Sequence, residues 1–435
     1  MSKATAIPVT LPVLDALFSD EAFKSTLKSK VELTEDQITQ LQKLAGDEVA
    51  RLRQLNTEEQ GGAPESPQAE ESRQRASEAI RGLLGEQKAE GLFGLAREYW
   101  AKGGVDLNAS NAKEATDTVG PNAVPKDTRI VVNIPAYRMD VFVSGALVKS
   151  YKIGIGYPEF PLPTGLRKAE TIIFNPTWTP PDEPWVAKMK GVAVGEPVPG
   201  GSKLNPLGPI KIPIGQPSLI HGGKSPAKLG TFASHGCVGL TTAQVQDFAK
   251  LLARSAGREI SDKAFQSYLK DKTKTQAVKL GQAIPVELRY ETIVVEDGKL
   301  HIYRDVYDQD TNTEANLSAV LSANGLKLED LSEEERADVM AALNAMSRHP
   351  SKPVSKPASS PVAKSAASPS PSAAEKSVPV GEKVAAKSPR KPIGKNQKEV
   401  VIESDAFQGK GYPAAVSLDT GSGKPAAKVD QAKAP

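Results

Sequence analysis

The spacing of apolar residues changes at Arg129, and this change constrains the fold more than any other feature of the chain. Before it, apolar residues recur at helical spacing in two runs, at 38–52 and at 80–100. After it, short runs such as 139–143 and 147–151 alternate apolar with polar side chains and are rich in β-formers. The sequence therefore predicts a helical module followed by a mostly β domain.

Residues 1–126 contain the helical signals. The sequence Thr-Glu-Asp-Gln at 34–37 is typical of a capped helix start, and Gly, Ala, Pro and Ser at 61–67 predict a loop between the two runs. We expect a small helical hairpin or bundle, which acts either as a packing or spacer module or as a domain that binds a partner.

The β domain is expected to begin with a meander. Turn residues at 135–136 and 144–145 separate three short strands within the stretch 130–151. A Pro- and Gly-rich stretch at 179–209 exceeds the usual length of a connection, so it predicts a lid or a cleft wall. The other predicted elements are a strand around Ile172, strands at 210–214, 218–220, 286–295 and 300–303, and a helix near 242–256.

The chain beyond the β domain changes composition. We assign 127–308 to the β domain and 309–348 to a helical extension, because helical signals cover 317–346. The stretch 349–435 is dominated by Lys, Ala, Pro and Ser and has almost no aromatic residues. Such a composition buries too little apolar area to offset backbone entropy, so we predict a disordered tail.

The charge is unevenly distributed, although the whole chain carries a formal charge of only +3. Residues 1–126 carry 15 basic and 20 acidic side chains, whereas 351–435 carry 14 basic and 7 acidic ones. Electrostatic attraction to an anionic polymer is therefore expected from the tail alone, and a solvated tail without a partner fits equally well. No nucleic-acid partner is predicted.

The only cysteine, Cys237, ends the sequence Ser-His-Gly-Cys at 234–237. Two of the four histidines of the chain, His221 and His235, lie close to it in sequence. A free thiol has a pKa of about 8.5, and a neighbouring imidazole can take its proton. We interpret Cys237 as a nucleophile and one of the two histidines as its base.

The turn at Cys237 lies between an expected strand end and an expected helix start. Backbone N–H groups of such a turn can point at a developing oxyanion, and Gly236 lets a substrate carbonyl approach closely. A small buried cysteine is the plainer alternative. A zinc site of His221, His235 and Cys237 matches no common spacing and lacks an evident fourth ligand, so we predict neither a metal nor a cofactor.

These residues resemble the active-site signature of the L,D-transpeptidases, the YkuD domain family. The signature comprises Ile-His-Gly at 220–222 and Ser-His-Gly-Cys-Val at 234–238 followed by Leu240. Family-like blocks also precede it in the expected order, at 163–165, 175–181 and 205–208. The resemblance covers roughly residues 127–308, and it implies a β-sandwich or open barrel with the thiol in a cleft.

The resemblance implies a cell-wall enzyme that acts on the tetrapeptide stems of peptidoglycan. Cys237 would attack the carbonyl of the diamino acid at stem position three, release D-alanine and form a thioester. An amine of another stem would then give a 3→3 cross-link, whereas a lysine of a wall-anchored lipoprotein, a free D-amino acid or water would give other products. A hydrolase and a non-catalytic wall-binding protein remain alternative functions.

Roles for individual residues follow from the same resemblance. His221 matches the general base, and Gly222 the position that orients it. Ser234 would fix the turn in which His235, Gly236 and Cys237 supply the N–H groups of the oxyanion hole.

Position 239 departs from the family pattern, which usually has Arg or Asn two residues after the cysteine, whereas this chain has Gly239. An Arg could hold a substrate carboxylate through two charge-assisted hydrogen bonds, which glycine cannot replace. Arg167, Lys168 or Lys224 are candidates for the missing charge.

A wall substrate requires export, so we expect a periplasmic or envelope location. Residues 1–18 do not match a signal peptide, because Pro8, Pro12 and Asp15 interrupt their apolar stretch. No segment reaches the roughly 20 apolar residues needed to span a bilayer.

Overall fold

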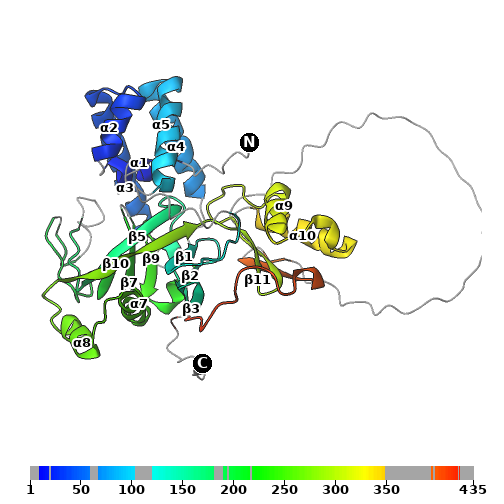
Figure 1. Ribbon diagram of the computed structural model, residues 1–435. Helices are drawn as coiled ribbons and strands as arrows, with labels where there is room; N and C mark the ends of the chain where they lie inside the picture. The colour runs from blue at the N-terminus through cyan, green and yellow to red at the C-terminus, as the bar shows by residue number, and fades with distance from the viewer. Residues whose placement is uncertain are drawn as a thin grey trace, which may run out of the picture.

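Within the part of the chain that the structure describes, the elements form three groups: a helical bundle, a central sheet and a smaller unit of mixed helices and strands (Figure 1). In Figure 1 the bundle is blue, the sheet cyan to green, and the smaller unit yellow and red. The computed structural model describes residues 9–18, 21–58, 67–102, 120–180, 190–193, 195–215, 218–347, 393–394, 397–419 and 421.

The N-terminal helices pack around one apolar core, which confirms the predicted helical module. Thr34 caps the longest helix, because its Oγ1 accepts from Gln37 N at 3.2 Å while Gln37 Oε1 accepts from Thr34 N. The predicted second helix is divided at Gly85, which has a φ of +74° and ends one helix before the next begins. The helices are α1 (Leu11–Phe18), α2 (Glu21–Lys30), α3 (Glu35–Glu58), α4 (Pro67–Leu84) and α5 (Glu86–Lys102).

The central element is a curled, mixed sheet of eight strands in the order β3-β2-β1-β10-β5-β6-β7-β9. The meander of the first three strands is confirmed, since β1 and β3 both pair with β2 in antiparallel register. Two pairs are parallel, β1 with β10 and β7 with β9. The strands are β1 (Arg129–Asn133), β2 (Arg138–Val143), β3 (Ala146–Lys152), β5 (Gly165–Phe174), β6 (Ile210–Pro213), β7 (Leu219–Lys224), β9 (Val238–Thr241) and β10 (Gln276–Arg289).

The predicted main helix, α7 (Thr242–Ser255), begins directly at the end of β9. Thr241 and Gln244 form a capping box, so the helix start is fixed to the last residue of the strand. Val245 and Phe248 enter the apolar core of the sheet. A short parallel pair, β4 (Ile155–Gly156) with β8 (Phe232–Ser234), leads into the turn before β9, and α8 (Asp262–Lys270) was not predicted.

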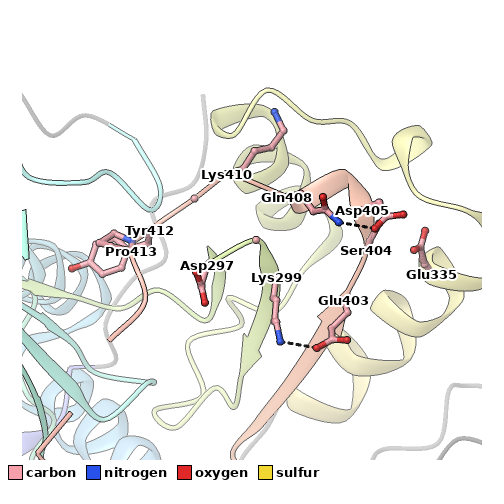
Figure 2. A pocket seen from close by; sticks show the side chains of 13 residues that line it. Asp297, Lys299, Glu335, Glu403, Ser404, Asp405, Gln408, Lys410, Tyr412 and Pro413 are labelled. Atoms are coloured by element: carbon pink, nitrogen blue, oxygen red, sulfur yellow. Dashed lines mark hydrogen bonds and ion pairs between the residues drawn. The ribbon is translucent and has the colours of Figure 1, made fainter. Parts of the chain in front are cut away.

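A smaller unit follows the sheet. Its strands β11 (Ile293–Glu296), β12 (Lys299–Tyr303) and β13 (Glu399–Glu403) form an antiparallel sheet that packs on α9 (Glu314–Ala323) and α10 (Glu333–Met346). A polar cavity of about 840 Å³ opens in this unit (Figure 2). Lys299 donates to Glu403 across its edge at 2.6 Å.

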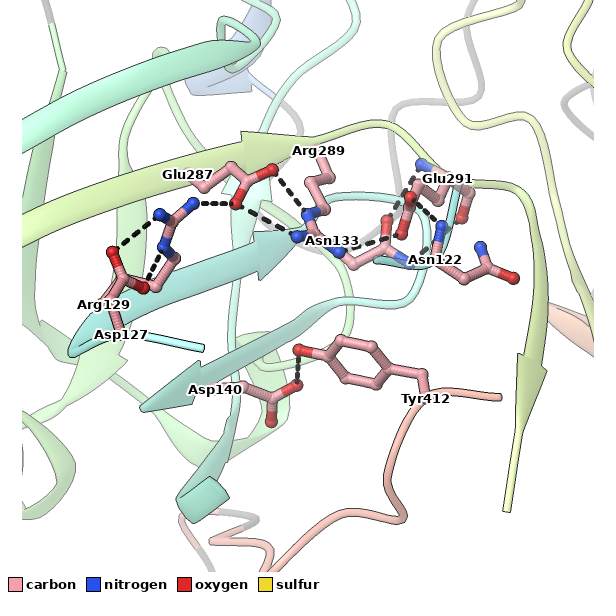
Figure 3. A network of polar contacts seen from close by, with 9 residues as sticks. All are labelled: Asn122, Asp127, Arg129, Asn133, Asp140, Glu287, Arg289, Glu291 and Tyr412. Atoms are coloured by element: carbon pink, nitrogen blue, oxygen red, sulfur yellow. Dashed lines mark hydrogen bonds and ion pairs between the residues drawn. The ribbon is translucent and has the colours of Figure 1, made fainter. Parts of the chain in front are cut away.

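The stretch 397–419 departs from the expectation of a disordered tail over 349–435. Its strand β13 pairs with β12, and Phe407 is buried in the core of the smaller unit. The chain then reaches the central sheet, where Tyr412 Oη donates to Asp140 at 3.1 Å, as Figure 3 shows. Three buried apolar or aromatic side chains, Ile402, Phe407 and Tyr412, anchor this stretch, although the surrounding composition obscures them.

Buried charges join the strands that lie at the centre of the sheet. Arg129 on β1 and Arg289 on β10 both bind Glu287, at 3.0 and 2.9 Å (Figure 3). Because these side chains are paired, burial of their charges does not destabilise the sheet as isolated charges would.

Candidate active site

The turn that carries Cys237 is held by two serines. Ser234 Oγ accepts from Cys237 N at 3.0 Å and donates to the carbonyl oxygen of the same residue at 2.5 Å. Ser218 Oγ donates to the carbonyl oxygen of Gly236 at 2.8 Å. Gly236 has a φ of +88°, which favours glycine. The peptide between Gly236 and Cys237 is thus held at both its C=O and its N–H.

The hydrogen bonds of this turn engage one of the N–H groups that are expected to form an oxyanion hole. The N–H of Cys237 is already bonded to Ser234 Oγ, so an oxyanion would have to displace that hydroxyl. Ser218 was not found from the sequence, because one serine before a strand carries no distinguishing signal. Only the fold reveals its contact with the turn.

His221 lies on β7 and is 4% exposed. Its Nδ1 lies 2.8 Å from the carbonyl oxygen of Gly222, and the backbone of Leu207 also contacts the ring. In the tautomer that donates from Nδ1 to Gly222, Nε2 is the acceptor of the neutral ring. Burial and the charge of Lys224 lower the pKa of His221 to about 3. The ring is therefore neutral at neutral pH.

Adjacent parallel strands bring His221 and the thiol into one region. His221 aligns with Gly239 on β9, and Cys237 immediately precedes this strand. Among the described residues, no hydrogen bond joins the thiol to the imidazole. His235 is exposed, and its ring lies edge-on to Phe160 at 4.6 Å between centroids. The geometry therefore favours His221 over His235 as the partner of the thiol.

The thiol of Cys237 is half-buried. Burial raises its pKa above the ordinary value, whereas a backbone contact with Leu219 and the charges of Lys224 and Lys211 lower it. At neutral pH the site therefore holds a neutral thiol and a neutral imidazole, and proton transfer must accompany the attack of the sulfur.

Of the three candidates for the missing charge, only Lys224 lies at the site. Arg167 on β5 is 2% exposed, and burial lowers its pKa to about 10. Lys168 is exposed and pairs with Glu170 at 2.8 Å. Lys224 ends β7, on the strand of His221, and its charge acts on the thiol.

The helical bundle contacts the loop that carries Phe160, whose ring packs against His235. Val49 of α3 packs against Phe160, whose ring meets His235. Thr10 Oγ1 donates to the carbonyl oxygen of Glu159 in the same loop at 3.3 Å. This contact could not be predicted from local sequence patterns, because it joins segments more than 100 residues apart.

Among the described residues, no group of three or more His, Cys, Asp or Glu side chains is arranged to hold a metal ion. In those same residues, none of the helices is both long and apolar enough to cross a membrane. The predicted lid at 179–209 lies partly outside the described residues. Val198, within this range, forms an isolated β-bridge with Trp178, which immediately precedes the range.

The chain is similar to known L,D-transpeptidases. The family model of the L,D-transpeptidase catalytic domain, YkuD, matches residues 127–276. The probable L,D-transpeptidase YbiS of Escherichia coli K12 is 32% identical over 155 residues, 34% of this chain and 47% of that protein. The chain thus spans about half the length of the curated relatives it matches.

Solved structures give more distant matches. The NMR structure of the catalytic domain of Enterococcus faecium L,D-transpeptidase is 17% identical, covers 38% of this chain and 98% of that domain, and has a TM-score of 0.25. An L,D-transpeptidase from Mycobacterium smegmatis is 15% identical, covers 38% of this chain and 58% of that chain, and has a TM-score of 0.23.

Proposed function

We propose that this chain, whose residues 127–276 belong to the YkuD family of L,D-transpeptidase catalytic domains, transfers acyl groups of peptidoglycan stem peptides through a thioester on Cys237. The observation that carries the proposal is the parallel pairing of β7 with β9, which aligns His221 with Gly239 beside the thiol. His221 is neutral at neutral pH, which is the protonation state a general base requires, and its lowered pKa makes it a weaker base than a free imidazole.

In the first half of the reaction, Nε2 of His221 takes the proton of the Cys237 thiol, and the sulfur attacks the carbonyl carbon at stem position three. The carbonyl oxygen gains negative charge, which the N–H groups of the turn at 235–237 stabilise, that of Cys237 after the oxyanion displaces Ser234 Oγ. The bond to the terminal D-alanine breaks, and its amine leaves with the proton held by His221. A thioester on Cys237 remains.

In the second half, an acceptor attacks the thioester carbon and gives its proton to His221. The C–S bond breaks, and the thiolate of Cys237 recovers that proton. A side-chain amine of another stem gives a 3→3 cross-link, and a lysine of a wall-anchored protein attaches that protein to the wall. Water as acceptor gives hydrolysis, the alternative that Gly239 motivates because it lacks a side chain to hold substrate.

Intact mass spectrometry of the purified full chain with a disaccharide tetrapeptide tests the proposal. We expect a thioester adduct on Cys237, release of D-alanine and the appearance of dimers, all absent in Cys237→Ala. His221→Gln should form the adduct at less than about a hundredth of the wild-type rate. His301→Gln is the matched control, since His301 lies on β12 and pairs with Glu399.

The remaining outcomes decide between the alternatives. An adduct that yields only tripeptide identifies a hydrolase. No adduct and no product from folded protein would overturn the proposal in favour of a wall-binding role. Because the stems lie outside the cytoplasmic membrane, an active enzyme would work in the cell envelope.

A further inference from the structure

The side chain of Lys224 occupies the space that a side chain at position 239 would fill. A Cβ atom placed on Gly239 would lie 2.9 Å from Cγ of Lys224, 3.0 Å from Cε and 3.4 Å from Cδ. Non-bonded carbon atoms prefer separations of about 3.5 to 4.0 Å. A side chain at 239 and the present conformation of Lys224 therefore exclude each other.

A bulge in β7 turns Lys224 toward this space. His221 aligns with Gly239 and Lys224 with Thr241, so three steps along β7 match two steps along β9. In a regular strand, residues three apart face opposite sides of the sheet, and the extra residue cancels that alternation. Lys224 therefore faces the same side as His221. Gly223, within the bulge, has a φ of +83°, which favours glycine.

The ammonium group of Lys224 acts on both proposed catalytic side chains. Its charge lowers the pKa of the Cys237 thiol and that of His221. Burial lowers the pKa of Lys224 itself, and the nearby thiol raises it. Among the residues that the structure describes, no carboxylate or carbonyl group forms a hydrogen bond or ion pair with Lys224. An anion that enters the site would therefore have no competing partner for this ammonium among the described residues.

We propose that Lys224 binds a carboxylate of the stem peptide, supplying from β7 the positive charge that Gly239 cannot supply from β9. The inference rests on the proposed function, because the carboxylate belongs to the substrate of that reaction. A stem tetrapeptide ends in a carboxylate on D-alanine, close to the peptide bond that Cys237 attacks. A charge-assisted hydrogen bond from Lys224 to a carboxylate would hold that bond near the sulfur.

Two measurements on the full chain test this role. Steady-state kinetics of D-alanine release give KM and kcat for a stem tetrapeptide, and iodoacetamide alkylation of Cys237 against pH reports the charge beside the thiol. We expect Lys224→Met to raise KM about tenfold, the effect of one lost charge-assisted bond. We also expect alkylation at pH 7 to slow by about threefold, because the thiolate loses a nearby cation.

A second set of variants separates charge from structure. Lys224→Arg should stay within about twofold of wild type in both measurements, since the charge is kept. Gly239→Arg added to Lys224→Ala should bring KM back to within about threefold of wild type, because removal of Cγ, Cδ and Cε of the lysine leaves space for the new side chain. Lys168→Met, which removes an exposed lysine already paired with Glu170, should change neither quantity.

The proposal is overturned if Lys224→Met matches Lys168→Met in both measurements, or if Lys224→Ala raises KM and Gly239→Arg added to it recovers nothing. Should Lys224→Met not fold, Lys224→Gln takes its place. Alkylation of Cys237 does not depend on catalytic turnover. An inactive wild type would therefore refute the proposed function, whereas alkylation would still show whether the charge of Lys224 acts on the thiol.

Discussion

Ser218 donates a 2.8 Å hydrogen bond from Oγ to the carbonyl oxygen of Gly236, the residue before the thiol. Ser218 is buried and lies immediately before β7, so this bond links the strand of His221 to the turn of Cys237. The N–H of the same peptide, on Cys237, donates to Ser234. One peptide plane is therefore held by two side chains, and its orientation determines where the N–H groups of the turn point.

Ser218→Ala should lower kcat about tenfold, because the turn loses one of the two bonds that orient its peptide. The free energy of unfolding should fall by about 1 kcal/mol, since the carbonyl of Gly236 loses its partner. Kinetics of D-alanine release and urea denaturation measure the two effects. Ser322→Ala, at an exposed position of α9, is the control. A wild-type kcat in Ser218→Ala would show that the turn keeps its orientation without this bond.

Gly236→Ala should impair activity through backbone strain alone. An added Cβ has room, since its nearest neighbours are carbonyl oxygens 3.9 Å away, but the φ of +88° disfavours any other residue. We expect a loss of about 1–2 kcal/mol in stability and a fall in kcat. Gly257→Ala is a matched control, because Gly257 has a φ of +69°, an open environment and a position after α7. If Gly236→Ala and Gly257→Ala lose the same stability and have the same activity, the conformation of the turn at Gly236 has no specific effect on catalysis.

His221 should make the protein less stable in mild acid. Its pKa falls from the ordinary 6.5 to about 3 in the folded state, so below pH 6.5 the unfolded chain binds a proton that the folded protein does not. The free energy of unfolding should therefore decrease by up to about 1.4 kcal/mol per pH unit as the pH falls from 6.5 toward 3.

His221→Gln removes this titration. Urea denaturation of wild type and variant at pH 7.5, 5.5 and 4.5 should show their stability difference shifting in favour of the variant as the pH falls. At pH 7.5 both side chains are neutral, so that comparison isolates the packing effect of the substitution. A stability difference that is the same at all three pH values would mean that the folded protein protonates His221 as readily as the unfolded chain does.

The local signals near the thiol were readable from the sequence because each depends on neighbours in the chain. The Thr241 cap needs only Gln244 three residues later, and the strand that enters His221 shows in its own apolar residues. The predicted strand at 286–295 covers only the end of β10 and is divided in the structure between β10 and β11. Gly281 and Pro285 both look like strand breakers, yet pairing with β5 continues on both sides of a bulge there.

What escaped prediction depends on contacts between distant segments. Lys224 could not be chosen over Arg167 or Lys168 because the bulge that turns it toward Gly239 exists only when β7 pairs with β9. The Ser218 bond to the turn likewise needs the sheet to form first. Pairing register follows from the buried faces of whole strands, which a single motif does not encode.

The stretch 397–419 should behave as an integral part of the fold. Tyr412 N donates to Val295 O at 2.7 Å, and Asp419 N donates to Ser150 O at 2.9 Å, so its backbone is bonded to both the smaller unit and the central sheet. Backbone amides in such bonds exchange only when the structure opens. Hydrogen exchange followed by mass spectrometry should therefore show peptides from this stretch protected like those of β2 and β3, and Tyr412→Phe should weaken that protection.

The Tyr412 hydroxyl donates to Asp140, a buried carboxylate that also accepts from Arg138 at 2.8 Å. Removal of this hydroxyl in Tyr412→Phe should lower the free energy of unfolding by about 1–2 kcal/mol, as expected for the loss of a hydrogen bond to a charged group. Tyr268→Phe is the matched control, because among the described residues the hydroxyl of Tyr268 has no hydrogen-bond partner. If the backbone amides of 397–419 exchange in the wild type as fast as those of an unstructured peptide, the stretch is not an integral part of the fold. It would then belong to the disordered tail that its composition predicts.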